Sequence, residues 1–256
     1  MGNQFVSCEV KDGVATVRIN NPPVNALSAR VREGLDVALR ETGEAKVFVI
    51  SGEGKMFSAG VDIKDLAGIS SGEEARSFSE GCHGVFGRIE RSRRPVIAAI
   101  NGHCLGGGLE LALCCHIRIA SENARLGLPE INLGVIPGAG GTQRLPRMVG
   151  SPRALEMMLT GEPLSAEEAL TCGLINRVTK LESLMDETLF LAKRIAAKSA
   201  PAVSCIIEAV EGGRNVPIEL ALELESKLFG DVFTTEDSKE GLKAFLEKRP
   251  PEFKDK

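Results

Sequence analysis

The chain lacks the features that mark several common classes of protein. Its 256 residues carry a net charge of −4 and contain no long run of lysine and arginine, which argues against a nucleic-acid partner. No apolar run approaches the length of a membrane-spanning helix, so we expect no membrane partner. The first ten residues do not combine a charged segment with an apolar core. We therefore expect no signal peptide and a cytoplasmic protein.

Signatures of metal sites and disulfides are also absent. The seven cysteines show no CxxC spacing and stand in apolar surroundings, which predicts reduced, buried thiols. The three histidines, His83, His103 and His116, do not have the spacing of metal ligands. We expect no metal, and we interpret all three histidines as structural.

What the sequence does contain is an ordinary globular composition with strands and helices in alternation. Hydrophobic residues make up 43% and charged residues 26%. In the first hundred residues we expect strands at 5–10, 14–19, 46–51 and 95–100, and helices at 28–41 and 73–91. This order predicts an α/β fold with a mostly parallel core.

Beyond residue 150 the pattern becomes mainly helical. Ser151 with Pro152, and Ser165 with Glu168, predict two helix starts. We expect helices near 151–159, 165–172, 183–199, 201–211, 216–229 and 235–248, and one short strand at 174–178. We divide the chain into a core domain, 1–197, and a C-terminal helical region, 198–256.

The segment 101–144 is the candidate active site. It carries two glycine clusters, at 106–108 and 138–141, and between them Glu110 and Glu130 stand in otherwise apolar sequence. Buried acids are costly unless they have a partner or a chemical task. One interpretation is structural ion pairing to Arg118 or Arg144. The other is catalysis, because glycine turns between a strand and a helix are where α/β folds bind ligands.

The chain resembles the enoyl-CoA hydratase/isomerase family, the crotonase superfamily, over essentially its whole length. Five segments carry the resemblance: Asn21–Leu27, Phe57–Leu66, Pro95–Leu113, Gly127–Leu145 and Leu159–Val178. The resemblance implies a crotonase-like spiral of ββα units with a C-terminal helical trimerisation region. It also implies a homotrimer or a dimer of trimers.

The resemblance also implies roles for individual residues. The backbone N–H groups of Val61 and Gly107 match the family's oxyanion hole for a thioester carbonyl. Glu110 matches the acid that holds and deprotonates a water molecule, and Glu130 the acid that protonates C2. The backbone N–H of Gly138 matches a contact to the same water.

An acyl-CoA thioester is the partner that the resemblance implies, and no separate cofactor is expected because CoA is part of the substrate. The matched CoA-binding positions are Ala26, Leu27, Ala59, Gly60, Val61, Asp62, Ile63, Lys64 and Gly107. Lys243, Phe245 and Lys248 are candidates to touch the CoA of a neighbouring subunit, with an ordinary solvated helix face as the alternative.

Two positions depart from the family's usual pattern. Val61 replaces a common alanine, and its β-branched side chain narrows the space around the backbone donor. Leu128 stands where many hydratases carry glutamine. The paired acids favour hydration of trans-2-enoyl-CoA. Double-bond isomerisation on the Glu130 carboxylate, hydrolysis of a thioester or carbon–carbon bond, and non-enzymatic acyl-CoA or RNA binding are the alternatives.

Overall fold

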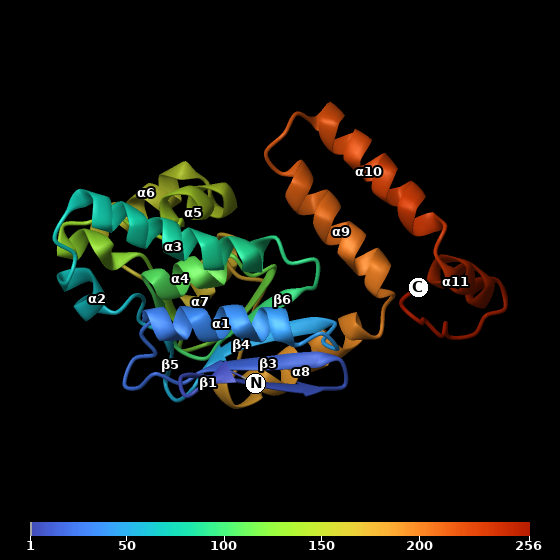
Figure 1. The fold of residues 1–256 in the computed structure, drawn as a ribbon, viewed down its shortest axis with the longest axis horizontal. Helices are drawn as coiled ribbons and strands as arrows, with labels where there is room; N and C mark the ends of the chain where they lie inside the picture. The colour runs from blue at the N-terminus through green and yellow to red at the C-terminus, as the bar shows by residue number, and fades with distance from the viewer. Residues whose placement is uncertain (1) are drawn as a thin grey trace.

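The computed structural model describes residues 2–256, and its centre is a seven-stranded sheet (Figure 1). The strands lie in the order β1-β2-β3-β4-β6-β8-β11. Their bounds are β1 (Gly2–Asn3), β2 (Val6–Lys11), β3 (Val14–Ile19), β4 (Val47–Gly52), β6 (Val96–Ile100), β8 (Ile117–Ser121) and β11 (Arg177–Thr179). Every pair from β3 onward is parallel, which confirms the predicted mostly parallel core.

The predicted N-terminal hairpin is present. β2 and β3 pair antiparallel, with Lys11 opposite Val14. The two residues between them, Asp12 and Gly13, both have positive φ, at 52° and 73°. This backbone geometry matches the twist of a two-residue hairpin, and Asp-Gly favours it.

Alternate residues of the parallel strands pack into two separate cores. Phe48 and Ile50 of β4 belong to the larger core, while Val47 and Val49 belong to a smaller one that also contains Leu184. Because successive side chains of a strand point to opposite faces, helices must cover both sides of the sheet. The continuous apolar run of β4 is the sequence pattern of such a strand.

A second, four-stranded sheet was not predicted. Its order is β10-β9-β7-β5, with bounds β5 (Met56–Ser58), β7 (His103–Leu105), β9 (Arg125–Gly127) and β10 (Leu164–Ser165). Each of β5, β7 and β9 follows a buried strand of the large sheet and precedes a helix or 3₁₀ turn. This repeat is the ββα unit that the resemblance implies. Strands of two or three residues are too short for an alternating pattern to reveal.

Helices cover the sheets and extend beyond them. Their bounds are α1 (Ala29–Glu41), α2 (Ile63–Ala67), α3 (Gly72–Glu90), α4 (Gly107–Leu113), α5 (Gly141–Val149), α6 (Ser151–Thr160), α7 (Ala166–Thr171), α8 (Leu184–Ala196), α9 (Ala200–Gly213), α10 (Ile218–Phe233) and α11 (Glu236–Leu246). Two 3₁₀ helices are η1 (Pro129–Leu133) and η2 (Leu181–Ser183). In residues 2–256 no helix is both long enough and apolar enough to cross a membrane.

Some predicted boundaries match the structure and others differ from it. The capping box of Ser165 and Glu168 is present. Ser151 is the first residue of α6 rather than its cap, and the cap is Gly150. The strand expected at 174–178 is wrong in both bounds and runs over Arg177–Thr179, because the N–H of Leu174 still bonds Ala169 O at the end of α7 (2.8 Å).

The C-terminal helices α9, α10 and α11 project away from the layered core (Figure 1). The predicted division at residue 198 falls between α8 and α9 and stays a prediction. α9 and α10 pack against each other and expose large apolar side chains: Ile206, Val210, Ile218, Leu222, Phe229 and Phe233.

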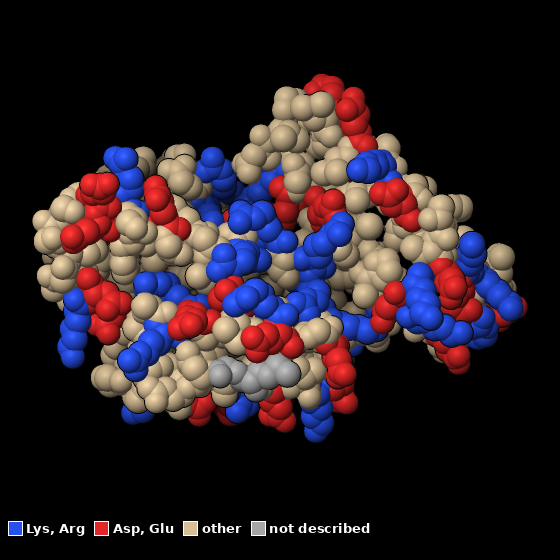
Figure 2. All heavy atoms as spheres, in the orientation of Figure 1, with Lys and Arg blue, Asp and Glu red and all other residues tan. Residues whose placement is uncertain are grey.

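Charged residues join this helical region to the core. On the face shown in Figure 2, acidic and basic side chains are mixed, and basic ones gather between the layered core and the C-terminal helices. Arg93, after α3, pairs with Glu208 of α9, and Lys46 pairs with Asp255 at 2.5 Å. These two ion pairs connect the helical region to the core.

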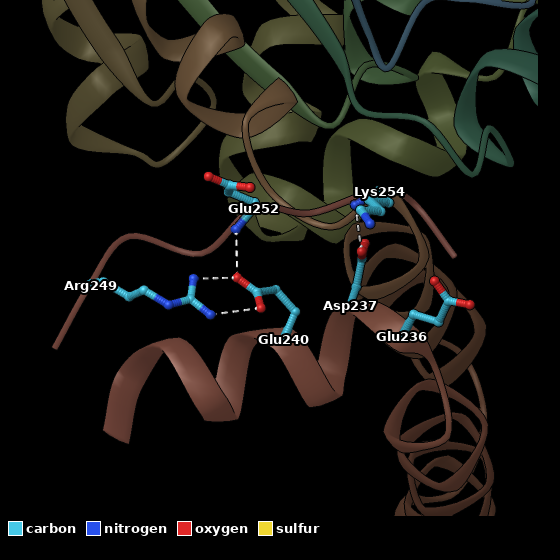
Figure 3. Close-up of a pocket in the computed structure, with 6 residues that line it drawn as sticks. All are labelled: Glu236, Asp237, Glu240, Arg249, Glu252 and Lys254. Atoms are coloured by element: carbon cyan, nitrogen blue, oxygen red, sulfur yellow. Dashed lines mark hydrogen bonds and ion pairs between the residues drawn. The ribbon is translucent and has the colours of Figure 1, made fainter. Parts of the chain in front are cut away.

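A hollow beside α11 is lined by charged residues that fasten the C-terminal tail (Figure 3). Asp237 accepts hydrogen bonds from the N–H groups of Lys254 (2.6 Å) and Asp255 (3.0 Å). Glu240 binds both terminal nitrogens of Arg249, at 2.6 and 2.9 Å. Asp237 and Glu240 already bind groups of the C-terminal tail, so we interpret this hollow as a structural feature.

Candidate active site

Two glycine turns from different ββα units meet at one place. Gly60 and Val61 follow β5, while Gly106 and Gly107 follow β7, and β5 and β7 are parallel neighbours. A Cβ atom built on Gly60 would lie 2.9 Å from the backbone nitrogen of Gly107. A Cβ atom built on Gly107 would lie 3.1 Å from the backbone nitrogen of Val61. The structure therefore brings the two predicted oxyanion donors side by side.

Both donor N–H groups are free. Within residues 2–256, neither the Val61 N–H nor the Gly107 N–H meets a hydrogen-bond acceptor. Gly107 is the first residue of α4, where backbone N–H groups have no partner inside the helix. The Val61 side chain lies close by, since its Cγ1 is 3.1 Å from the Cβ position of Gly107. The narrowing expected from valine in place of alanine stays a prediction.

The predicted CoA-binding positions also lie together. The N–H of Leu27 donates to Gly60 O (2.7 Å), which places Ala26 and Leu27 beside the first glycine turn. Asp62 caps α2 by accepting from the N–H of Lys64 (2.9 Å). The side chains of Ile63 and Lys64 are exposed beyond it.

Glu110 is held by the second glycine cluster. It lies in α4 with only 2% of its surface exposed. Its Oε1 accepts hydrogen bonds from the N–H groups of Ala139 (2.7 Å) and Gly141 (2.8 Å). Burial raises the pKa of this carboxyl, while the two N–H donors and the nearby charge of Arg144 act to lower it.

The contact predicted for Gly138 in the second glycine cluster concerns a water and not Glu110. Gly138 was expected to hold a water through its N–H, which stays a prediction, and its carbonyl accepts from Ser79 Oγ (2.5 Å). The bonds to Glu110 come from Ala139 and Gly141. The glycine-rich sequence marked the turn correctly, but nothing in the sequence distinguishes one backbone N–H of a turn from the next.

Glu130 lies on η1 and faces the first glycine cluster. Its Oε1 is 2.9 Å from the position that a Cβ of Gly106 would occupy, and its Oε2 is buried without a hydrogen-bond partner. Burial, and then the negative charge of Glu110, raise the pKa of Glu130 to about 7. This shift favours the protonated form of Glu130 near neutral pH more than in an ordinary glutamate.

The alternative that these acids form structural ion pairs is wrong. Arg144 pairs with Glu90, at 3.0 and 2.8 Å. Arg118 donates instead to backbone carbonyls, including Leu174 O at 2.7 Å. Among the residues that the structure describes, no lysine or arginine lies within ion-pair distance of Glu110 or Glu130.

Two further predicted features have contrasting surroundings. Leu128 is fully buried beside the second glycine cluster, with its Cδ1 2.8 Å from the Cβ position of Gly141. Lys243, Phe245 and Lys248 lie on or just after α11, at the far end of the molecule from α2 (Figure 1). Phe245 is 82% exposed. Their contact with a neighbouring subunit's CoA stays a prediction.

The arrangement joins two chemical capacities. Two free N–H groups can stabilise a negative oxygen, because fixed donors act most strongly where charge develops. Two buried carboxyls with different surroundings can divide the roles of base and acid. Such a site suits addition of water, or movement of a proton, next to a carbonyl group.

Comparisons with known proteins identify the family. The family model described as enoyl-CoA hydratase/isomerase matches residues 9–256. A probable enoyl-CoA hydratase of Bacillus subtilis is 46% identical over 253 residues, covering 97% of this chain and 98% of the relative. A crotonyl-CoA hydratase of Syntrophomonas wolfei is 40% identical and covers 99% of both chains.

Solved structures give the same result for the fold. The crystal structure of enoyl-CoA hydratase from Bacillus anthracis superimposes with a TM-score of 0.94 at 38% identity, covering 99% of this chain and 100% of the other. The expected crotonase-like fold is confirmed. The chain belongs to the enoyl-CoA hydratase/isomerase family.

Proposed function

We propose that this protein is an enoyl-CoA hydratase that adds water reversibly to trans-2-enoyl-CoA and gives 3-hydroxyacyl-CoA. The observation that carries the proposal is the buried pair Glu110 and Glu130 beside the free N–H groups of Val61 and Gly107. The hydratase names of relatives at 40–46% identity support the same reaction.

In the proposed mechanism the thioester carbonyl accepts from the N–H groups of Val61 and Gly107. As water adds to C3, negative charge develops on this oxygen, and the two donors stabilise it. Removing one such donor in other enzymes slows the reaction about 10²–10³-fold. The segment around Ala26, Leu27 and 59–64 borders the first of these donors and is the proposed CoA-binding surface.

The two acids divide the proton transfers. Glu110, whose Oε1 has two N–H donors, is the proposed base that deprotonates water. Glu130, whose pKa is raised to about 7, is the proposed acid that delivers a proton to C2. A group with a pKa near the working pH is efficient in either direction of proton transfer, which suits a reversible reaction.

Mixing the protein with crotonyl-CoA tests the proposal. Loss of the conjugated enoyl-thioester absorbance, with a product heavier by one water, is the expected result. Longer and aromatic enoyl-CoAs extend the assay to other acyl chains. If none of these substrates gains water while a trans-3-enoyl-CoA is converted to its trans-2 isomer, the protein is an isomerase and the proposal fails.

We also propose a homotrimer, alone or paired into a hexamer. The exposed apolar side chains on α9 and α10, such as Ile206 and Phe229, support it, because a large apolar surface is commonly covered by association. Light scattering coupled to size-exclusion chromatography should give three or six times the chain mass. A monomer at micromolar concentration contradicts this assembly.

A further inference from the structure

An ion pair stands behind the turn that holds Glu110. Arg144, in α5, makes two bonds to Glu90 at the end of α3, from Nε to Oε1 (3.0 Å) and from Nη2 to Oε2 (2.8 Å). The two side chains are 15% and 26% exposed. A half-buried, two-bond pair of this kind holds a guanidinium in one orientation.

The remaining donor of Arg144 reaches the turn itself. Its Nη1 donates to the carbonyl oxygen of Ala139 (3.1 Å), while the N–H of the same residue donates to Glu110. The guanidinium also lies against Gly140, whose φ is +109°. A Cβ atom on Gly140 would stand only 1.9 Å from Nη1. Glycine therefore allows the arginine to pack directly on the turn.

Glu110 depends on this turn for its orientation. In residues 2–256 its carboxylate accepts hydrogen bonds only from Ala139 and Gly141, which flank Gly140. A shift of the turn thus moves the carboxylate. Misplacement of a reacting group by about 1 Å can cost about 10²-fold in rate.

The positive charge of Arg144 also acts on the carboxyl of Glu110. The titratable groups that influence one another around this carboxylate are Cys82 of α3, Cys114 of α4, Glu130 of η1 and Arg144 of α5. The cysteines and Glu130 add no positive charge. The arginine charge lowers the pKa of Glu110 and opposes the effect of burial.

We propose that Arg144, held by Glu90, is a positioning residue for Glu110 that fixes the Ala139–Gly141 turn and places its positive charge beside the turn that holds this carboxylate. The proposal rests on the proposed hydratase function for its kinetic consequence. It assigns a role to an ion pair that does not touch the substrate.

The test compares Arg144→Gln, Arg144→Lys and Glu90→Gln with Arg147→Gln as the matched control. Arg147 lies on the same helix, but it bonds Gln143 O (2.7 Å) and not the turn. We expect kcat with crotonyl-CoA to fall about 10–100-fold in Arg144→Gln, with KM within about 3-fold of wild type. The control should stay within about 2-fold. Thermal melts verify that each variant folds.

The pH profile separates positioning from simple structural support. Loss of the arginine charge raises the pKa of Glu110, so the acid limb of kcat/KM should move to higher pH in Arg144→Gln. Arg144→Lys keeps the positive charge but loses the planar guanidinium that makes several bonds at once. The acid limb of its kcat/KM profile should therefore stay near that of wild type, while kcat remains reduced. Glu90→Gln should lower kcat without an upward shift of the limb.

A readout without turnover distinguishes failure of this inference from failure of the proposed function. In the free protein with ¹³C-labelled glutamate carboxyls, the Glu110 signal is assigned by its absence in Glu110→Gln. Its titration should move to higher pH in Arg144→Gln, even if wild type hydrates no substrate. An unmoved titration, or an Arg144→Gln kcat equal to that of Arg147→Gln, overturns the inference. If Arg144→Gln does not fold, a kcat equal to that of wild type in both Arg144→Lys and Glu90→Gln also overturns the inference.

Discussion

The two glutamates differ in what surrounds each carboxyl. Glu110 accepts two backbone N–H bonds, which favour its ionised form, whereas Glu130 has a buried oxygen without a partner, which favours its neutral form. The negative charge of Glu110 adds to this effect on Glu130. Burial raises the pKa of both carboxyls, and the differences between their surroundings support the proposed assignment of Glu110 as the base and Glu130 as the acid.

This difference predicts a pH-dependent gain in stability for Glu130→Gln. The pKa of Glu130 is raised in the fold from 4.5 to about 7, so ionising it costs folding free energy. That cost is absent below the unfolded pKa, grows as pH rises towards 7, and is complete above it. We expect Glu130→Gln to exceed wild type by about 1–3 kcal/mol near pH 8, and by little near pH 4.5.

Urea unfolding at the two pH values measures this gain. Glu122→Gln is the control, because Glu122 is exposed and lies outside the site. A gain of equal size at both pH values, or one shared by the control, contradicts the described environment of Glu130.

At the level of single residues, the two acids were recognisable because a charged side chain in an apolar segment is costly to bury without a function or a partner. Ala139 and Gly141 were not, because every residue except proline carries the same backbone N–H. Arg144 was identified only as a possible ion-pair partner of the acids. Its true partner, Glu90, lies 54 positions earlier in the chain.

At the level of elements, the site is built from short turns that connect strands to helices. Gly106 has φ +53°, accepts the N–H of Glu110 on its carbonyl (3.0 Å), and donates its own N–H to Gly127 O (2.9 Å). One glycine thus links the start of α4, the end of β9 and the space occupied by Glu130.

Replacing this glycine should damage activity more than stability. In Gly106→Ala the new Cβ would lie 2.9 Å from Glu130 Oε1, so the carboxylate must move. We expect kcat to fall about 10²-fold. Gly54→Ala is the matched control, since Gly54 also has positive φ (+75°) but no atom within 4 Å of its Cβ position.

Both alanine variants should lose stability from the positive φ, about 1–2 kcal/mol, and Gly106→Ala the more, because its ψ of −129° lies outside the left-handed region. Only Gly106→Ala should lose activity. Kinetics with crotonyl-CoA and thermal melts of the two proteins provide the comparison, and an equal kcat in both contradicts the proposed contact.

Element prediction succeeded where the pattern was long. The apolar runs of β4 and β6, and the capping box before α7, were visible in the sequence, because burial on both faces and paired cap bonds both need particular residues. The four strands of the second sheet were missed. Their pairing depends on distant partners, such as Met56 opposite His103, and not on a local pattern.

At the level of the whole molecule, the C-terminal tail ties separate parts together. Asp255 accepts the N–H of Ala200 (3.0 Å) and pairs with Lys46 (2.5 Å), while Asp237 of α11 holds the N–H groups of the tail. The tail therefore connects α11, the start of α9 and the core. Segments 209 positions apart in sequence meet here, and no local pattern predicts such a contact.

Removing the buried carboxylate of Asp237 should weaken the attachment of the C-terminal tail. Asp237 is 2% exposed, so Asp237→Ala leaves the part-buried N–H groups of Lys254 and Asp255 without this acceptor. The expected loss is about 1–3 kcal/mol. Glu236→Ala is the control, because Glu236 is its exposed neighbour, whereas the N–H groups of Lys254 and Asp255 donate to Asp237.

Thermal melts and release of C-terminal residues by carboxypeptidase measure the effect. Asp237→Ala should melt lower and lose its tail faster than Glu236→Ala. Equal behaviour of the two variants contradicts the role given to the tail.

The central claim is that Glu110 and Glu130 act together on water at a thioester held by Val61 and Gly107. The most direct test is turnover of crotonyl-CoA by wild type, Glu110→Gln and Glu130→Gln, with binding of a non-reactive acyl-CoA measured in parallel. We predict rapid hydration by wild type, a loss of about 10²–10⁴-fold in kcat for each variant, and binding within about 3-fold of wild type. Near-normal turnover by either variant would contradict the account.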